Sequence, residues 1–191
     1  MKKIAILASG SGSNAENIVR HFVGNEHAGV KLIVSDRENA GVLSRAKRLN
    51  VDGYYISRKS MRESNQLMDM LHDYKIDVIV LAGFLALIPS ELIQAFDHRI
   101  INIHPALLPA YGGKGMYGVR VHQAVIENNE TESGISIHYV NEKYDEGNII
   151  LQAKCPVYKS DDTNSLANRI HKLEYRYYPQ VIEQLIEMAL V

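Results

Sequence analysis

The sequence lacks the marks of three classes of protein. Its single cysteine, Cys155, can form no intramolecular disulfide and has no second cysteine with which to hold a metal. Its 21 Lys and Arg residues nearly balance 22 Asp and Glu residues, so it has no basic excess of the kind that binds nucleic acid. Its first apolar run, residues 4–8, is too short for a signal peptide or a membrane span. We therefore expect a cytoplasmic protein that binds neither nucleic acid nor membranes.

What the chain does have is an ordinary globular composition. Of its 191 residues, 46% are hydrophobic and 23% are charged, which is enough apolar material for one sizeable core. No internal repeat, low-complexity segment or linker divides it, so residues 1–191 are predicted to form a single domain. Cys155 lies in an apolar, strand-like run, which indicates a buried structural thiol rather than a reactive one.

Short apolar runs alternate with amphipathic stretches through the first half of the chain. The continuous apolar run at residues 78–82 is typical of a strand in a sheet that is covered on both faces. This alternation predicts an α/β fold with a Rossmann-like, mostly parallel sheet and helices on both faces. The expected strands are residues 4–8, 31–35, 54–57, 78–82 and 100–103, and the expected helices begin near Asn14 and span residues 40–49 and 61–74.

The second half of the chain contains two further strands. Residues 133–140 alternate strictly between apolar and polar side chains, which predicts a half-exposed strand with His138 on its polar, outer face. This strand is expected to form an antiparallel pair with residues 149–157 across a turn that contains Asp145.

Loops and helices surround this predicted pair. Residues 106–118 are rich in Gly and Pro and indicate a functional loop, and residues 119–127 have a helical pattern. A long helix is expected from Thr163, and Pro179 should kink or interrupt it.

A glycine-rich loop, Gly10-Ser11-Gly12-Ser13-Asn14-Ala15, joins the first strand to the first helix. Glycine lets the backbone approach an anion, and a helix start aims free N–H groups at it, so the loop predicts a phosphate site. Ser13 is also a common N-cap residue, so a plain strand-to-helix turn has the same pattern. The loop fits G-x-G-x-x-A as well, and with Asp36 at the next strand end it is compatible with dinucleotide binding by an oxidoreductase.

The strand at residues 100–103 leads into a polar pair. Asn102 and His104 are two residues apart, so on a strand they point to the same face. A carboxamide can hold an oxyanion and an imidazole can move protons near neutral pH, which together suit chemistry on a carbonyl. Asp145 lies in a turn where Asp and Gly are ordinary, and it becomes functional only if that turn folds over His104. The histidines at positions 27, 72, 98 and 122 receive no role, and His138 is interpreted as a surface residue.

Four segments of the chain resemble the folate-dependent formyltransferases, and the first is typical of the glycinamide ribonucleotide branch. The match runs in order through essentially the whole chain. The segments are Ala8-Ser9-Gly10-Ser11-Gly12-Ser13-Asn14, Leu81-Ala82-Gly83-Phe84, Asn102-Ile103-His104-Pro105-Ala106-Leu107-Leu108-Pro109, and Gly134-Ile135-Ser136-Ile137-His138-Tyr139-Val140 running on to Asp145-Glu146-Gly147.

The resemblance implies a role for each matching residue. The catalytic group would be Asn102, His104 and Asp145, with Asp145 favouring the charged form of His104. The nucleotide substrate would be held in the N-terminal half by a phosphate loop, with help from the long helix, through Gly12, Ser13, Asn14, His171 and Glu174, the last on the ribose. The folate would lie against the C-terminal half along Leu85, Ala86, Leu87, Ile88, Asn102, Asn141, Glu142, Asp145 and Arg58.

The match departs from the family at two of these folate positions. Many members carry a basic residue where this chain has Ala86, so only backbone contacts carry over there. The upstream basic residue that contacts folate is matched by either Arg58 or Lys59.

The implied reaction moves a formyl group from 10-formyltetrahydrofolate to the amine of glycinamide ribonucleotide, in purine biosynthesis. The amine is the nucleophile, so neither a metal nor an enzyme nucleophile is implied. The partners would be small molecules only, and the protein a monomer or weak homodimer.

Four rival functions share part of this pattern. Methionyl-tRNA formyltransferase and formyltetrahydrofolate hydrolase have the same three residues, but both need an extra domain, and tRNA binding needs a basic excess. A nicotinamide-dependent oxidoreductase, or a non-catalytic nucleotide-binding module, would leave Asn102, His104 and Asp145 unexplained.

Overall fold

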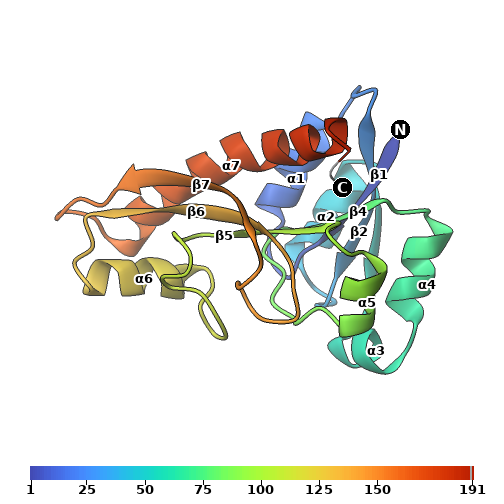
Figure 1. Cartoon of the computed structure of the whole chain (residues 1–191), viewed down its shortest axis with the longest axis horizontal. Coiled ribbons are helices and arrows are strands. Elements are labelled where there is room, and N and C mark those ends of the chain that lie inside the picture. The colour runs from blue at the N-terminus through green and yellow to red at the C-terminus, as the bar shows by residue number, and fades with distance from the viewer. Residues whose placement is uncertain (190) are drawn as a thin grey trace.

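The computed structural model describes residues 1–189 and 191. Within them, seven strands form one sheet in the order β3-β2-β1-β4-β5-β6-β7 (Figure 1). The strands β1 to β5 run parallel, and β6 and β7 are antiparallel to their neighbours, which confirms the predicted fold class. The strands are β1 Lys2–Leu7, β2 Ala28–Ser35, β3 Asp52–Tyr55, β4 Val78–Leu81, β5 Ile100–His104, β6 Glu132–Tyr139 and β7 Ile149–Pro156.

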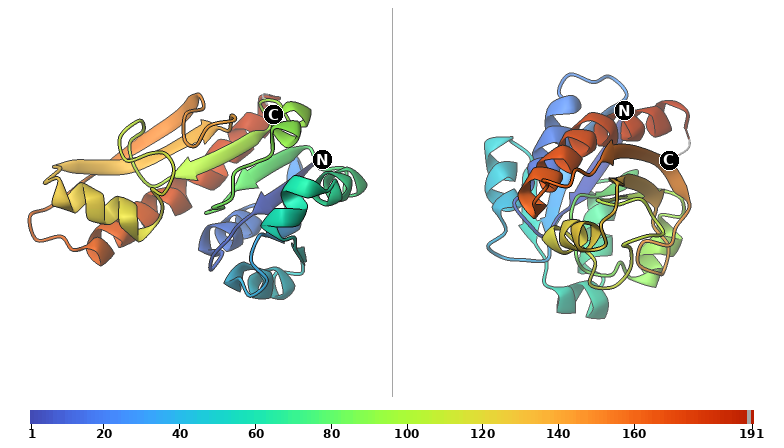
Figure 2. Two further views of the ribbon diagram at one scale, coloured as in Figure 1. Left: turned by 90° about the horizontal axis from the view of Figure 1, so that it is seen from below. Right: turned by 90° about the vertical axis from the view of Figure 1, so that its left-hand side faces the viewer.

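Helices cover both faces of this twisted sheet (Figure 2). Alternate residues of β1 point to opposite faces, so Ile4 and Ile6 join one apolar core while Ala5 and Leu7 join another. The first core includes residues of α1, α2 and α7, and the second includes residues of α3, α4 and α5. The helices are α1 Ser13–His21, α2 Gly41–Arg48, α3 Arg58–Glu63, α4 Gln66–Asp73, α5 Ser90–Ala95, α6 Val119–Glu127 and α7 Thr163–Glu187.

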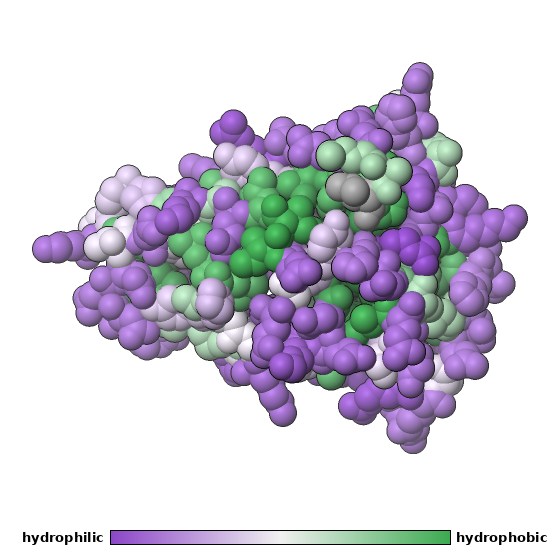
Figure 3. Space-filling view, in the orientation of Figure 1, coloured by the Kyte–Doolittle hydropathy of each residue, from purple (hydrophilic) through white to green (hydrophobic). Residues whose placement is uncertain are grey.

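The surface of the molecule is mixed. In the orientation of Figure 1, hydrophobic residues gather along the middle of the visible face beside α7, with hydrophilic residues around them (Figure 3). Among the described residues, no helix is both long and apolar enough to cross a membrane.

The single helix predicted over residues 61–74 is wrong, because the structure has α3 and α4 in its place. The backbone is extended at Ser64, with φ −142° and ψ 161°, and this ends α3. The Ser64 hydroxyl bonds back to the carbonyl of Ser60 and also accepts from the N–H of Gln66. Serine competes in this way for backbone groups, so a helical apolar pattern can continue across a break.

The prediction of a half-exposed β6 is also wrong. Residues 133–138 are all buried, and His138 is only 2% exposed. The polar face of β6 is covered by the loop that follows β5, and its side chains satisfy that loop: the Ser136 hydroxyl donates to the carbonyl of Ala106 and accepts from the N–H of Leu108. The alternating polar residues of β6 therefore form a buried face, because a loop distant in the sequence supplies their hydrogen-bond partners.

Pro179 does not interrupt α7, contrary to one of the two outcomes expected from the sequence. Proline has no N–H, so the carbonyl of Tyr175, one turn earlier, loses its helical donor. The side-chain amide of Asn17, in α1, donates to that carbonyl at 2.9 Å. This bond from α1 stabilises α7 across Pro179. It also connects α7 to α1, the helix that follows the glycine-rich loop.

Candidate active site

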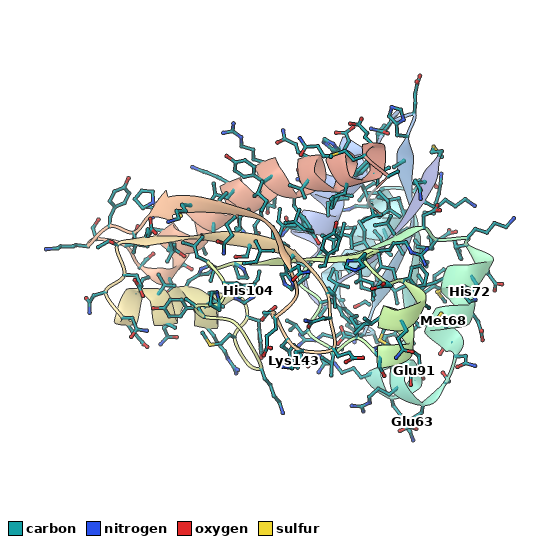
Figure 4. The ribbon with its side chains drawn as sticks, viewed as in Figure 1. Glu63, Met68, His72, Glu91, His104 and Lys143 are labelled. Atoms are coloured by element: carbon teal, nitrogen blue, oxygen red, sulfur yellow. The ribbon has the colours of Figure 1, made fainter. Side chains whose placement is uncertain are left out.

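A cavity of about 560 Å³ opens at the carboxyl ends of β1, β4 and β5. Its wall combines the glycine-rich loop, the ends of β4 and β5, the loop at residues 113–118, Asp145 and part of α7. Ligands of open α/β sheets bind at such strand ends. His104 lies on the same side of the sheet as the loop that carries Lys143 and Asp145 (Figure 4).

His104 is 3% exposed, and both of its ring nitrogens have neighbours. Nε2 donates to the carbonyl oxygen of Tyr111 at 2.8 Å, so this nitrogen carries a hydrogen. Nδ1 lies 3.5 Å from Oδ2 of Asp145 and is the nitrogen left to exchange a proton. Burial lowers the pKa of His104 and outweighs the opposing effects of the Asp145 carboxylate and the Tyr111 carbonyl. Asp145 therefore acts in the predicted direction, but burial leaves the resting imidazole neutral.

The turn that carries Asp145 does fold over His104. Burial opposes ionisation of Asp145, but the nearby imidazoles of His138 and His104 and the N–H of Gly113 together hold its pKa below the ordinary value. Oδ2 accepts from the Gly113 N–H at 3.0 Å, and Oδ1 lies 3.4 Å from Nδ2 of Asn102. The condition set by the sequence is met, and an ionised carboxylate lies beside the imidazole.

Asn102 shares this position with a histidine that the sequence placed at the surface. Its Nδ2 lies 3.0 Å from Nε2 of His138, and Nδ1 of His138 lies 2.8 Å from the carbonyl of Tyr139. In the antiparallel pair, Asn102 is directly opposite His138 and His104 is opposite Ser136. The two-residue spacing of Ser136 and His138 shows that they share one face of a strand. Only the register of β5 and β6 shows that this face lies opposite Asn102 and His104.

The glycine-rich loop packs closely against α2 and leads directly into α1. Gly12 has φ +83°, and a Cβ there would lie 2.5 Å from the Val42 side chain, so only glycine fits between this loop and α2. α1 begins at Ser13 with Gly12 as its N-cap, which corrects the alternative in which Ser13 was the N-cap. Arg45 donates to the carbonyl of Ser11 at 2.7 Å and holds the loop in place.

The loop is connected to α7 through Asn14. Nδ2 of Asn14 donates to Glu174 at 3.0 Å, and Nδ1 of His171 lies 2.8 Å from the same carboxylate oxygen. Hydrogen bonding to Glu174 raises the pKa of His171. Glu174 is 5% exposed, and Oδ1 of Asn14 is buried without a partner. The predicted nucleotide residues therefore lie together at one end of the cavity.

The predicted folate residues are only partly brought together. Leu85 and Arg58 line the cavity, and the N–H of Leu85 donates to the hydroxyl of Ser9 at 2.9 Å. Ile88 is buried in the core, so only its backbone is available. The cavity wall does not include Ala86, Leu87, Ile88, Asn141 or Glu142.

Arg58 and Lys59, the two alternatives for the basic folate residue, lie in different surroundings. Arg58 lines the cavity, whereas Lys59 is exposed and lies 3.8 Å from Glu63. Nε of Arg58 also donates to Asp36 at 2.6 Å, and the Asp36 side chain is fully buried. A dinucleotide ribose would need that carboxylate, so the geometry disfavours the oxidoreductase reading.

His122, which received no role from the sequence, also lines the cavity. It lies in α6 with 3% exposure, and its Nδ1 is buried with no hydrogen-bond partner. Burial lowers the pKa of His122. The sequence does not indicate that His122 is buried, because its burial depends on how α6 packs against α7.

Replacing His122 by methionine is expected to make the fold less sensitive to acid. In the unfolded chain the His122 side chain takes up a proton near pH 6.5, whereas in the folded chain it does so only at lower pH. The free energy of unfolding therefore has its full value above about pH 6.5 and falls as the pH drops toward the pKa of His122 in the folded chain. Each unit by which folding lowers the pKa of His122 changes the free energy of unfolding by up to about 1.4 kcal/mol. Urea unfolding at pH 7.5 and 5.5 measures this, and an equal loss of stability in both proteins would contradict it.

The whole chain resembles proteins of known activity. It matches the formyl transferase family over residues 2–182. It is 42% identical, over 97% of its length, to the chloroplastic phosphoribosylglycinamide formyltransferase of Arabidopsis thaliana, and spans 66% of that protein. It is 37% identical to the phosphoribosylglycinamide formyltransferase of Bacillus subtilis, covering 97% of this chain and 95% of the relative.

Solved structures agree with these sequence matches. Glycinamide ribonucleotide transformylase 1 of Geobacillus kaustophilus superimposes with a TM-score of 0.88 at 36% identity, covering 97% of this chain and 99% of that one. The enzyme of Bacillus halodurans gives a TM-score of 0.88 at 34% identity, with coverage of 98% and 97%. The resemblance seen in the sequence is confirmed, and the chain belongs to the formyl transferase family.

Proposed function

We propose that the protein transfers the formyl group of 10-formyltetrahydrofolate to the primary amine of glycinamide ribonucleotide. The observation that carries this is the meeting of Asn102, His104 and Asp145 on the wall of a cavity that the glycine-rich loop and Glu174 also line. The first group suits acyl chemistry and the second suits a phosphate and a sugar. The names of the two relatives described above, which are 42% and 37% identical to this chain, support the same reaction.

The substrates are proposed to divide the cavity between them. The phosphate lies at Gly12, Ser13 and Asn14, where the first N–H groups of α1 have no helical acceptor. The ribose hydroxyls reach Glu174, next to His171. The folate lies against Leu85 and Arg58, with Tyr144 and Asp145 of the facing turn on its other side.

The chemical steps follow from the protonation states of the site. The substrate amine attacks the formyl carbon, a C–N bond forms, and the formyl oxygen becomes an oxyanion that Nδ2 of Asn102 stabilises. Neutral His104 accepts the amine proton at Nδ1, directly or through water, and the ionised Asp145 stabilises the resulting imidazolium. His104 then gives that proton to the folate nitrogen as its bond to carbon breaks. The products are the formylated amine and tetrahydrofolate, and His104 is neutral again.

A direct assay tests the proposed reaction. The protein is mixed with glycinamide ribonucleotide and 10-formyltetrahydrofolate, and formation of the folate product is followed by absorbance. Turnover that depends on both substrates is expected. Loss of formyl groups without the nucleotide would indicate a hydrolase, and binding of NAD(P)H without formyl transfer would favour the oxidoreductase.

Replacing Asp145 by asparagine is expected to move the titration of His104 to lower pH. The carboxylate raises the pKa of His104 against the effect of burial, so its removal leaves burial unopposed. The pH profile of kcat/KM reports this, together with histidine NMR signals of the free enzyme. An inflection at the same pH in both proteins would contradict the role given to Asp145.

A further inference from the structure

His138 is buried at the centre of the site, although nothing in the proposed reaction uses it. It is 2% exposed and faces Asn102 across the β5–β6 pair. Both ring nitrogens have partners: Nδ1 lies 2.8 Å from the carbonyl of Tyr139, and Nε2 lies 3.0 Å from Nδ2 of Asn102 and 3.7 Å from Oδ1 of Asp145. A buried imidazole with two such partners is held in one orientation.

The bond to Tyr139 determines the tautomer of this ring. A carbonyl oxygen only accepts, so Nδ1 of His138 must carry a hydrogen. In the neutral ring, Nε2 then has a lone pair and accepts. The group of Asn102 that faces it must be the NH₂, because the carboxamide oxygen would meet that lone pair. The direction of the Asn102 amide, which the strand alone leaves open, is therefore fixed by its neighbour.

The backbone around Tyr139 protects this arrangement. A Cβ on Gly147 would lie 1.7 Å from the carbonyl oxygen of Tyr139 and 3.4 Å from Nδ1 of His138, so the turn packs directly on this bond. The N–H of Tyr139 also donates to the carbonyl of Asn148 at 3.0 Å. The same turn that brings Asp145 over His104 therefore also covers the bond that sets the tautomer of His138.

One hydrogen of the Asn102 amide remains for chemistry. The first is taken by Nε2 of His138, and the second faces Oδ1 of Asp145 at 3.4 Å, which is long for a hydrogen bond. We propose that His138 is a positioning residue that holds the Asn102 carboxamide so that this second hydrogen, rather than the carbonyl oxygen, faces the formyl oxygen in the transition state. The inference rests on the proposed formyl transfer.

A double-mutant cycle tests the proposal, because a positioning residue acts only through the group that it positions. His138→Met is expected to lower kcat toward the roughly 10²–10³-fold loss typical of a missing oxyanion donor, with the nucleotide Kd unchanged. His138→Gln, which can offer a carbonyl oxygen to Nδ2, is expected to recover part of that loss. In an Asn102→Ala background, neither change should lower kcat further. His72→Gln, on exposed α4 (Figure 4), is the control that leaves kcat unchanged.

The outcomes separate this proposal from the one on which it rests. An equal loss of kcat in both backgrounds would overturn the positioning role while leaving formyl transfer intact. Absence of transfer by the unmodified protein would overturn the proposed function instead. In either case, the two side-chain amide hydrogens of Asn102 can be followed by ¹⁵N NMR. They are expected to shift in His138→Gln and His138→Met, and unshifted signals in the folded variants would contradict the contact.

Discussion

Replacing His104 by alanine is expected to lower turnover by about 10²–10⁴-fold, the usual contribution of a general acid–base group, while the affinity for glycinamide ribonucleotide stays nearly unchanged. The physical reason is the position of the ring. It lies at the end of β5 beside Asp145, whereas the nucleotide residues Asn14 and Glu174 are hydrogen-bonded to each other and neither contacts the His104 ring. Steady-state kcat and a separate calorimetric Kd for the nucleotide measure the two effects.

The matched control for this variant is another histidine on the cavity wall. His171→Ala removes the ring bonded to Glu174, so it is expected to weaken nucleotide binding more than it lowers turnover. His104→Ala should therefore change mainly kcat, and His171→Ala should change mainly the Kd for the nucleotide. If His104→Ala lost nucleotide affinity in parallel with turnover, His104 would be a structural residue and the proton-transfer role would be wrong.

Replacing Gly147 by alanine is expected to reduce turnover by about 10²-fold or more, although Gly147 touches no substrate. Its new Cβ would lie 1.7 Å from the carbonyl oxygen of Tyr139, so either the turn or the end of β6 must move. Asp145 is two residues away in that turn, and misplacing a catalytic group by about 1 Å can cost 10²-fold. Measurements of kcat and of the urea midpoint distinguish a displaced site from a globally unfolded chain.

The control for Gly147 lies in the same turn. The side chain of Glu146 is 60% exposed and is 3.2 Å from Lys143, so Glu146→Ala should leave both kcat and stability close to those of the unmodified protein. A Gly147→Ala protein with normal turnover would show that the turn adapts, and the tight packing on Tyr139 would then be irrelevant to the site.

Local patterns were sufficient for the architecture and for the first catalytic pair. The continuous apolar run at residues 78–82 predicted a central strand, and β4 lies in the middle of the sheet. The two-residue spacing of Asn102 and His104 predicted a shared face, and both approach Asp145 in the structure. These features depend on the geometry of a single strand, which the sequence specifies directly.

Features that depend on contacts between distant segments could not be predicted in this way. The burial of His138 follows from the pairing of β6 with β5, and the burial of His122 follows from the packing of α6. The neutral state of His104 is a balance between burial and Asp145, and only the folded cavity shows that burial has the larger effect. The sequence resemblance left Arg58 and Lys59 equivalent, and only the folded structure shows that Arg58 lines the cavity while Lys59 is exposed.

The central claim is that His104, Asn102 and Asp145 direct the formyl group to the substrate amine. The most direct measurement is the fate of that group, followed by ¹³C NMR in a single turnover with 10-formyltetrahydrofolate labelled at the formyl carbon. The label is expected on the amine nitrogen of glycinamide ribonucleotide, in an amount equal to the enzyme, and at a strongly reduced rate in His104→Ala. Label recovered as free formate, or transferred at the same rate by His104→Ala, would contradict the account.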